Sequence, residues 1–274
     1  MIMTEYNKFF EDYLKKVLKY NKPESLYDPV KYILESGGKR LRPLITLYIS
    51  ELFNGKRTVA LPAAAALEIF HNFTLAHDDI MDNSSIRRGK KTINAKWDDN
   101  TGILSGDVML ILSYEILNQY EDSKYVLFSK RLTEISRLVC EGQQADMDFA
   151  SKNDITENEY FEMIKNKTAV LIGCSFMFGG IAAETNTSNT DLLYRIGLNL
   201  GIAFQLEDDL LDCFGDQEKF GKKTGGDIIE KKKTLLFIYT HSQLDKKSEF
   251  ENIFYSSDLQ ESEKITSIIS FYKN

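Results

Sequence analysis

Two aspartate-rich motifs, each closing an apolar run of helical periodicity, constrain this sequence more than any other feature. The first is DDIMD at residues 78–82, and the second is DDLLD at residues 208–212. On a helix the first and last acids of each motif lie on one face, four residues apart. Like charges at that spacing destabilise a helix by about 0.2–0.5 kcal/mol. One such motif is typical of a solvated acidic face, but its repetition with the same spacing indicates a functional site.

The chemistry that suits these acids is the binding of divalent cations. Mg²⁺ prefers carboxylate oxygens and usually takes one or two of them together with substrate phosphates and water. Two such helix ends facing each other predict a multi-metal site for a diphosphate. Arg87 and Arg88 follow the first motif, and a lysine- and glycine-rich segment, residues 215–233, follows the second. Because arginine guanidinium groups match phosphate oxygens in pairs, these residues support an anionic substrate.

The hydrophobic pattern predicts an all-α chain. Apolar residues recur at intervals of three and four, strand signals are scarce, and the four prolines all precede Ala63. Capping boxes are expected at Thr156 with Glu159 and at Ser188 with Asp191. The expected helices cover residues 4–20, a segment ending at residue 35 before two glycines, a segment with Pro43 in its first turn, and residues 103–118 and 169–183.

Composition excludes several classes of function and location. A net charge of −7 argues against nucleic acid as a partner, because such binders usually carry a basic surface. The three cysteines lack CxxC spacing and are typical of reduced thiols in the cytoplasm. The N-terminal segment lacks a signal-peptide pattern, and the apolar run at 169–183 is too short to span a membrane. We therefore expect a soluble cytoplasmic protein without membrane insertion.

Six motifs together resemble a known family, the trans-type isoprenyl diphosphate synthases or polyprenyl synthetases. In the family's order they are GGKRLRP (residues 37–43), HDDIMD followed by RRG (77–89), GQQAD (142–146), KTA (167–169), FQLEDDLLD (204–212) and GKKTGGDIIEKKKT (221–234). The resemblance implies a single domain over residues 1–274, with a motif-bearing core at about 37–234. It also implies the helical bundle of the isoprenoid synthases, with a central cavity, assembled as a homodimer.

The implied activity is a 1′–4 condensation of isopentenyl diphosphate with an allylic diphosphate (dimethylallyl, geranyl or farnesyl), with loss of diphosphate. The resemblance implies about three Mg²⁺ ions at the active site. Lys167, through its backbone oxygen, with Thr168 and Gln205, would stabilise the allylic cation. The implied metal ligands are the six acids of the two motifs. The principal ligands are Asp78, Asp82 and Asp208, and the others are Asp79, Asp209 and Asp212.

The resemblance also assigns basic residues to the two diphosphates. Arg87 would bind the allylic diphosphate. Lys222 and Lys232 stand at positions that contact phosphate in the family. Isopentenyl diphosphate would be bound by Lys39, Arg42, His71 and Arg88. From the residues alone, a solvated basic face and a core histidine are the simpler interpretations of the first three. Asp146 remains either a support for metal-bound water or a surface residue.

Product length in the family depends on positions four and five before the first Asp, here Thr74 and Phe73. A small Thr74 beside a large Phe73 resembles the members that make C20 geranylgeranyl diphosphate, with C15 farnesyl diphosphate the close alternative. Phe73 can instead pack in the core, because it lies about 140° around the helix from Asp78.

Two other functions stay open, a class I terpene cyclase and a catalytically silent subunit of a heteromeric prenyl synthase. A cyclase mixes Asn, Ser or Thr with Glu in its second metal motif, whereas this chain repeats DDxxD. A silent subunit would have lost acids that are intact here. The chain departs from the family after Lys232, where a short charged C-terminal segment covers residues 241–274. Its charged sequence from Asp245 to Lys264 predicts one exposed helix and a loose tail.

Overall fold

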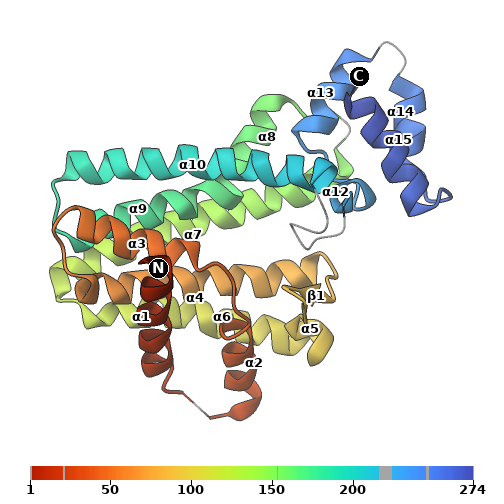
Figure 1. Cartoon of the computed structure of the whole chain (residues 1–274). Helices are drawn as coiled ribbons and strands as arrows, with labels where there is room; N and C mark the ends of the chain where they lie inside the picture. The colour runs from red at the N-terminus through yellow and green to blue at the C-terminus, as the bar shows by residue number, and fades with distance from the viewer. Residues whose placement is uncertain (1, 21, 153, 216–223, 245–246, 274) are drawn as a thin grey trace. The chain divides into compact units, whose positions relative to one another are not determined.

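The computed structural model describes residues 2–20, 22–152, 154–215, 224–244 and 247–273, and helices make up nearly all of their regular structure (Figure 1). The prediction of an all-α fold is therefore confirmed. The chain divides into two compact units. Unit 1 comprises Met1–Glu134 and Gly173–Ile196, and unit 2 comprises Ile135–Ile172 and Gly197–Asn274. The expectation of a single domain stays a prediction.

Unit 1 is built around α4 (Arg57–Met81), whose run of small and apolar residues is buried. Fully buried alanines at positions 60 and 63–66 allow α3 (Leu41–Leu52) and α6 (Asp99–Glu115) to pack against it. Gly106 of α6 faces His77 so closely that a Cβ atom would lie 2.2 Å from the imidazole Nε2. The other elements of unit 1 are α1 (Ile2–Val17), α2 (Glu24–Leu34), α5 (Ile93–Lys96), a 3₁₀ turn (Ile116–Gln119) and parts of α7 (Asp122–Ser151), α9 (Val170–Ala182) and α10 (Thr187–Phe214).

A short β-hairpin follows α4 and carries the two arginines of the first motif. Strand β1 (Ile86–Arg87) pairs antiparallel with β2 (Lys90–Lys91). The turn residues Arg88 and Gly89 have φ of 53° and 73°. Positive φ at both positions is the geometry of the tight turns that best match the twist of paired strands. The sequence patterns indicated only a loop here.

Unit 2 contains the remaining parts of α7, α9 and α10 together with α8 (Glu157–Ile164), a π-helical turn (Lys165–Ala169), α12 (Gly226–Ile229), α13 (Leu235–Gln243), α14 (Lys247–Tyr255) and α15 (Glu261–Lys273). Its core gathers aromatic and aliphatic side chains from α8 and from the last three helices. Phe250, Phe254 and Ile268 are fully buried in it. The prediction of one exposed helix and a loose tail is therefore wrong, because α14 and α15 have an apolar face that the charged residues around it conceal in the sequence.

The helix starts show one confirmed and one wrong prediction. Thr156 and Glu159 form the expected capping box at the start of α8. The expected box at Ser188 and Asp191 is not the cap of α10, because the carboxamide of Asn186 accepts the backbone N–H of Asn189 at 2.9 Å. An Asn side chain two residues earlier thus satisfies the same free backbone donors.

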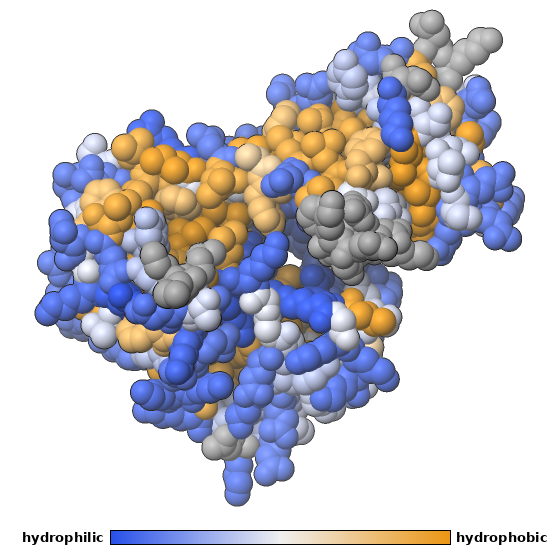
Figure 2. All heavy atoms as spheres, viewed as in Figure 1, coloured by the Kyte–Doolittle hydropathy of each residue, from blue (hydrophilic) through white to orange (hydrophobic). Residues whose placement is uncertain are grey.

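Apolar residues lie both on the surface of the protein and along the core helix α4. In the space-filling view (Figure 2) hydrophobic side chains gather over α10. Within the described residues one helix, α4, is long and apolar enough to cross a membrane, but 78% of its most apolar window is buried inside the protein. Core helices of soluble proteins share this pattern. The expected core helix at residues 169–183 is confirmed as α9, whose apolar residues are buried.

Candidate active site

The loop before α3 brings a glycine pair against an arginine of the hairpin. Gly38 has φ of 126°, and a Cβ atom at this position would lie 2.8 Å from the guanidinium carbon of Arg88. Only glycine fits this conformation and this contact. Arg88 also donates a hydrogen bond to the carbonyl of Gly37. The loop that carries the predicted ligand Lys39, an exposed side chain, therefore lies beside Arg88.

Arg42 and His71, predicted to act on the same substrate, are in contact. Arg42 Nη1 lies 3.1 Å from His71 Nε2. Burial, followed by the charge of Arg42, lowers the pKa of His71 well below its ordinary value. The ring is then neutral at pH 7, so its Nε2 accepts the hydrogen bond. Burial also lowers the pKa of Arg42 to about 10, which leaves its guanidinium charged near neutrality.

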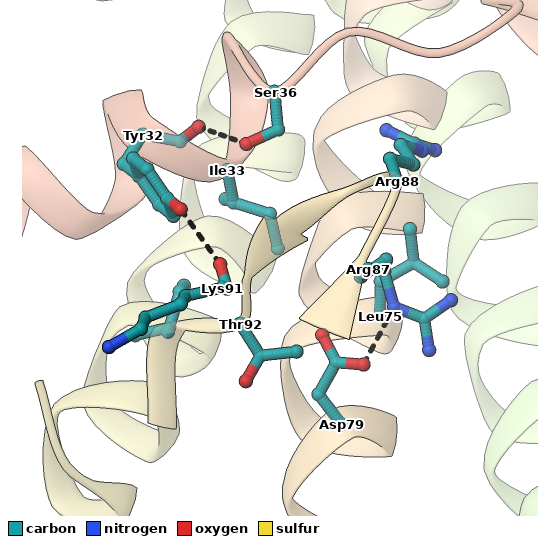
Figure 3. Close-up of a pocket in the computed structure, with 10 residues that line it drawn as sticks. Tyr32, Ile33, Ser36, Leu75, Asp79, Arg87, Arg88, Lys91 and Thr92 are labelled. Atoms are coloured by element: carbon teal, nitrogen blue, oxygen red, sulfur yellow. Dashed lines mark hydrogen bonds and ion pairs between the residues drawn. The ribbon is translucent and has the colours of Figure 1, made fainter. Parts of the chain in front are cut away.

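In the first acidic motif, the middle acid differs from its neighbours. Asp79 is 2% exposed and accepts a hydrogen bond from Arg87 Nε at 2.6 Å (Figure 3). Burial raises the pKa of Asp79, and the charge of Arg87 opposes that rise. Asp78 is half-buried, with its Oδ2 3.4 Å from Arg87 Nη2, and Asp82 is exposed at the end of α4. Asp82 is thus open to solvent, Asp78 is partly covered beside Arg87, and the middle acid anchors the hairpin.

A small cavity separates the hairpin from α2. Tyr32 donates a hydrogen bond to the carbonyl of Lys91 at 2.8 Å, and Ser36 donates to the carbonyl of Tyr32 at 2.6 Å (Figure 3). Arg87 and Asp79 line the other side of the cavity. Its volume of about 20 Å³ has room for about one water molecule and is far below that of a ligand pocket. The cavity is a packing gap behind the hairpin.

The second motif in unit 2 repeats this arrangement. The middle acid, Asp209, is buried and accepts hydrogen bonds from Tyr160 Oη at 2.5 Å and from Gln205 Nε2 at 2.8 Å. Gln205 in turn accepts a hydrogen bond from Thr168 Oγ1 at 2.9 Å. Two predicted cation-stabilising residues, Thr168 and Gln205, are therefore linked to the motif. Asp208 lies half-buried beside them.

The predicted Lys167 and Thr168 lie in the π-helical turn, a distortion common at functional sites. Two glycines make room for it: a Cβ atom at Gly142 would lie 2.2 Å from the backbone nitrogen of Lys167, and one at Gly201 would lie 2.6 Å from the Cα of Ala169. Lys167 Nζ forms an ion pair with Asp146 Oδ2 at 2.5 Å. Asp146, the last residue of the motif GQQAD, thus contacts the lysine of the next motif, KTA.

The residues after the second motif include an acid that the sequence analysis missed. Asp227 donates its backbone N–H to Asp212 Oδ2 at 3.0 Å, and its Oδ1 lies 3.7 Å from Lys232 Nζ. Burial, then the charge of Asp212, raises the pKa of Asp227 to about 7. The sequence signal that could have identified Asp227 is its place as the aspartate of the motif GKKTGGDIIEKKKT. The predicted ligand Lys222 lies outside the described residues.

The two predicted chain-length residues lie within unit 1 on α4. The ring of Phe73 is buried and packs at 5.4 Å from Phe70 and at 4.9 Å from the His77 ring, measured between ring centres. Thr74 donates a hydrogen bond to the carbonyl of His71 at 2.8 Å. Both a core role and a role in limiting a product chain are compatible with this position of Phe73.

The outer acids fit a hard divalent cation. Asp78 with Asp82, and Asp208 with Asp212, offer only oxygen donors, one helical turn apart, near the C-terminal end of a helix. The helix dipole is negative at that end, so a cation nearby stabilises carboxylates there. Among the described residues, no group of three or more His, Cys, Asp or Glu side chains is arranged to hold a metal. Two carboxylates per motif agree with Mg²⁺ completed by phosphate oxygens.

Comparison with known proteins identifies relatives along most of the chain. A family model described as polyprenyl synthetase matches residues 23–272. A geranylgeranyl diphosphate synthase from Saccharolobus solfataricus is 46% identical over 217 residues, which span 77% of this chain and 65% of that relative. A geranylgeranyl diphosphate synthase from Methanosarcina mazei is 38% identical over 231 residues, which span 82% of this chain and 70% of that relative. The chain thus spans about two thirds of the length of these curated relatives.

A solved structure is similar over a larger share. The crystal structure of a geranylgeranyl pyrophosphate synthase matches with a TM-score of 0.95 and 44% sequence identity, covering 99% of this chain and 84% of that one. The family predicted from the six motifs is confirmed by these matches. The chain belongs to the polyprenyl synthetase family.

Proposed function

We propose that this protein is a trans-prenyltransferase that condenses isopentenyl diphosphate with an allylic diphosphate and releases diphosphate. Its place in isoprenoid biosynthesis would be the synthesis of a short-chain isoprenyl diphosphate. The names of the similar proteins support geranylgeranyl diphosphate, the C20 compound, as the main product. Farnesyl diphosphate, the C15 compound, is the second candidate.

The observation that carries this proposal is the cation cluster of unit 1. Arg42 contacts His71, and Arg88 packs on the loop that carries Lys39. An enzyme that ionises one allylic diphosphate needs cations for that group alone. A second set, beside an acidic motif that has its own Arg87, supports a second diphosphate substrate. Prenyl transfer uses two diphosphates, and cyclisation uses one.

The acids would hold the metal. Asp78, Asp82, Asp208 and Asp212 are the residues that would bind Mg²⁺, which when bound supplies positive charge to neutralise the leaving diphosphate. Asp79 and Asp209 remain predicted ligands from the motif pattern, but their protein partners favour an anchoring role. The number of ions, about three in the family, is part of this proposal.

The other residues act on substrate and cation. Arg87 would bind the allylic diphosphate, and Lys39, Arg42, His71 and Arg88 would bind isopentenyl diphosphate, with Lys222 and Lys232 closing on phosphate oxygens. Departure of the diphosphate leaves an allylic carbocation. The Lys167 carbonyl, Thr168 hydroxyl and Gln205 amide oxygen would stabilise this cation by their dipoles. The alkene of isopentenyl diphosphate then attacks, and the released diphosphate accepts the proton that is lost from the product.

The remaining features of the proposal concern the oligomeric state and the cellular location. A homodimer is supported by exposed apolar side chains on α6 and α7. A cytoplasmic location is supported by the three cysteines, which are all free thiols.

One incubation separates the proposed function from its alternatives. Purified protein with Mg²⁺, isopentenyl diphosphate and either geranyl or farnesyl diphosphate should give a chain-elongated diphosphate, identified by mass after dephosphorylation. A cyclic hydrocarbon from the allylic substrate alone would instead support a terpene cyclase. Inactivity that is relieved only by a second polypeptide would support a silent subunit.

A further inference from the structure

Glu68 is a buried carboxylate to which the proposed chemistry assigns no role. It lies on α4 three residues before His71, and only 2% of its surface is exposed. A buried carboxylate is unfavourable unless it is paired and hydrogen-bonded. Its partners therefore indicate why it is present.

The main partner of Glu68 is Arg40, in the loop that carries Lys39. Arg40 Nη1 lies 2.6 Å from Glu68 Oε1, and Asn72 Nδ2 donates to the same oxygen at 3.2 Å. Arg40 also contacts Glu11 Oε1 at 2.7 Å and donates to the carbonyl of Leu34. The guanidinium of Arg40 is thus held from several directions.

The backbone conformation of Arg40 links its contact with Glu68 to the neighbouring residues Lys39 and Arg42. Arg40 precedes α3 with φ of 48°, a left-handed conformation that is strained for a residue other than glycine. Such a conformation persists only when surrounding contacts fix it. Because Lys39 precedes Arg40 and Arg42 follows it by two residues, the direction of both side chains depends on this turn.

Glu68 also balances charge for the rest of the cluster. Burial lowers the pKa values of Arg42 and Arg88, and the negative charge of Glu68 opposes this effect on both. One buried carboxylate therefore contacts the guanidinium of Arg40 and interacts electrostatically with those of Arg42 and Arg88. The cluster keeps an excess of positive charge, as an anion site requires.

We propose that Glu68 is a positioning residue for the diphosphate of the homoallylic substrate. Its carboxylate fixes Arg40 and, through the turn at Arg40, directs Lys39 and Arg42 towards that diphosphate. This inference rests on the proposed function, because it assigns a role within the same anion site.

Two substitutions separate position from charge. Glu68→Asp keeps the negative charge but shortens the side chain by one methylene, so that it no longer reaches Arg40. Glu68→Gln keeps the length but removes the charge. If Glu68 positions the turn, both variants should raise the KM for isopentenyl diphosphate by about tenfold or more, the effect of one lost charge-assisted hydrogen bond. The kcat at saturation and the KM for the allylic primer should stay within about twofold of the wild type.

A matched control lies in the same unit. Glu51 of α3 also pairs with an arginine, with Arg57 Nε 2.5 Å from Glu51 Oε1, away from the glycine loop. Glu51→Asp should leave the KM for isopentenyl diphosphate unchanged. If the Glu68 variants do not fold, Glu11→Ala removes the other, partly exposed partner of Arg40 and should raise the same KM.

Binding of inorganic diphosphate without Mg²⁺, measured by calorimetry, gives a readout apart from turnover. The inference predicts weaker binding in both Glu68 variants, although Glu68→Gln makes the site more positive. Unchanged binding in Glu68→Asp together with tighter binding in Glu68→Gln would show that Glu68 acts only as a charge, and would overturn the inference alone. A wild-type protein that binds no diphosphate and forms no elongated product would overturn the proposed function itself.

Discussion

The acids of each DDxxD motif divide into two kinds. Asp79 and Asp209 are buried and held by protein donors, Arg87 for the first and Tyr160 with Gln205 for the second. Their carboxylates fix the neighbouring chain, and the outer acids are the proposed metal ligands. Tyr160 is distant in sequence from Asp209, so no local pattern could reveal this pairing.

Replacing an outer acid should abolish activity without loss of the fold. Asp78→Ala or Asp208→Ala removes a proposed metal ligand, so kcat/KM should fall by about a hundredfold or more. The melting temperature without Mg²⁺ should stay level or rise slightly, because repulsion between like charges near a negative helix end is relieved. Asp191→Ala, at the exposed start of α10, should leave activity unchanged. A large drop in helicity that accounts for the lost activity would show that these acids are structural.

Phe73 allows a test of product length. Phe73→Ala should lengthen the product by one or more five-carbon units if the ring ends the product tunnel, and Thr74→Phe should shorten it towards C15. Mass analysis of dephosphorylated products measures both. Because Phe73 also packs against Phe70 and His77, its truncation should cost about 3–5 kcal/mol of stability. Destabilisation with unchanged product length would assign Phe73 to the core alone.

At the scale of elements, α4 carries much of the candidate site on one helix. Glu68, His71, Thr74 and Asp78 follow one another at intervals of three and four, so the loop contacts and the acidic motif share a rigid support. The site in unit 2 instead uses a distorted element, the π-helical turn with Lys167. Glycines on α7 and α10 are what allow neighbouring backbone to approach this turn.

Gly142→Ala tests the dependence of that turn on close packing. The added methyl would meet the backbone of Lys167 and displace the turn, so kcat should fall by about a hundredfold, as expected for a displacement near 1 Å. Glu141→Ala, the exposed neighbour on α7, serves as the control. Wild-type kcat in Gly142→Ala would contradict the view that this glycine positions Lys167 and Thr168.

The sequence predicted helix boundaries well where hydrophobic periodicity and capping residues act locally. The end of α2 before the glycines, Pro43 in the first turn of α3, and the capping box of α8 were all predicted. The hairpin of Arg88 and Gly89 was missed because strands of two residues leave no periodic signal. The start of α10 was misplaced because Asn186, Ser188 and Asp191 are all plausible caps by type.

The membership of the candidate site stays a prediction, and the contacts among its residues could not be read from the sequence. The family resemblance grouped Arg42 with His71, and Thr168 with Gln205, and both pairs are in contact in the structure. Glu68 and Tyr160 were missed because a single acid or tyrosine within an apolar helix has no distinctive spacing. Their roles depend on tertiary pairing, as does the burial of α14 and α15.

For the whole molecule, exposed apolar residues on unit 1 lead to a prediction about assembly. Leu104 and Ile111 are 57% and 62% exposed and lie seven residues apart on one face of α6. Light scattering should give a mass near twice 31.4 kDa for the wild type. Leu104→Glu with Ile111→Glu should reduce it to that of one chain, whereas glutamate at exposed Tyr239, in unit 2, should not. A wild-type monomer would refute the homodimer.

Whether the enzyme condenses two diphosphates can be measured by the coupling between substrate consumption and diphosphate release. Released diphosphate and incorporated isopentenyl units should be counted in the same Mg²⁺-containing reaction. We expect one diphosphate to be released for each five-carbon unit added, and no steady release with either substrate alone. Steady release from the allylic diphosphate alone, without incorporation of isopentenyl diphosphate, would contradict this expectation.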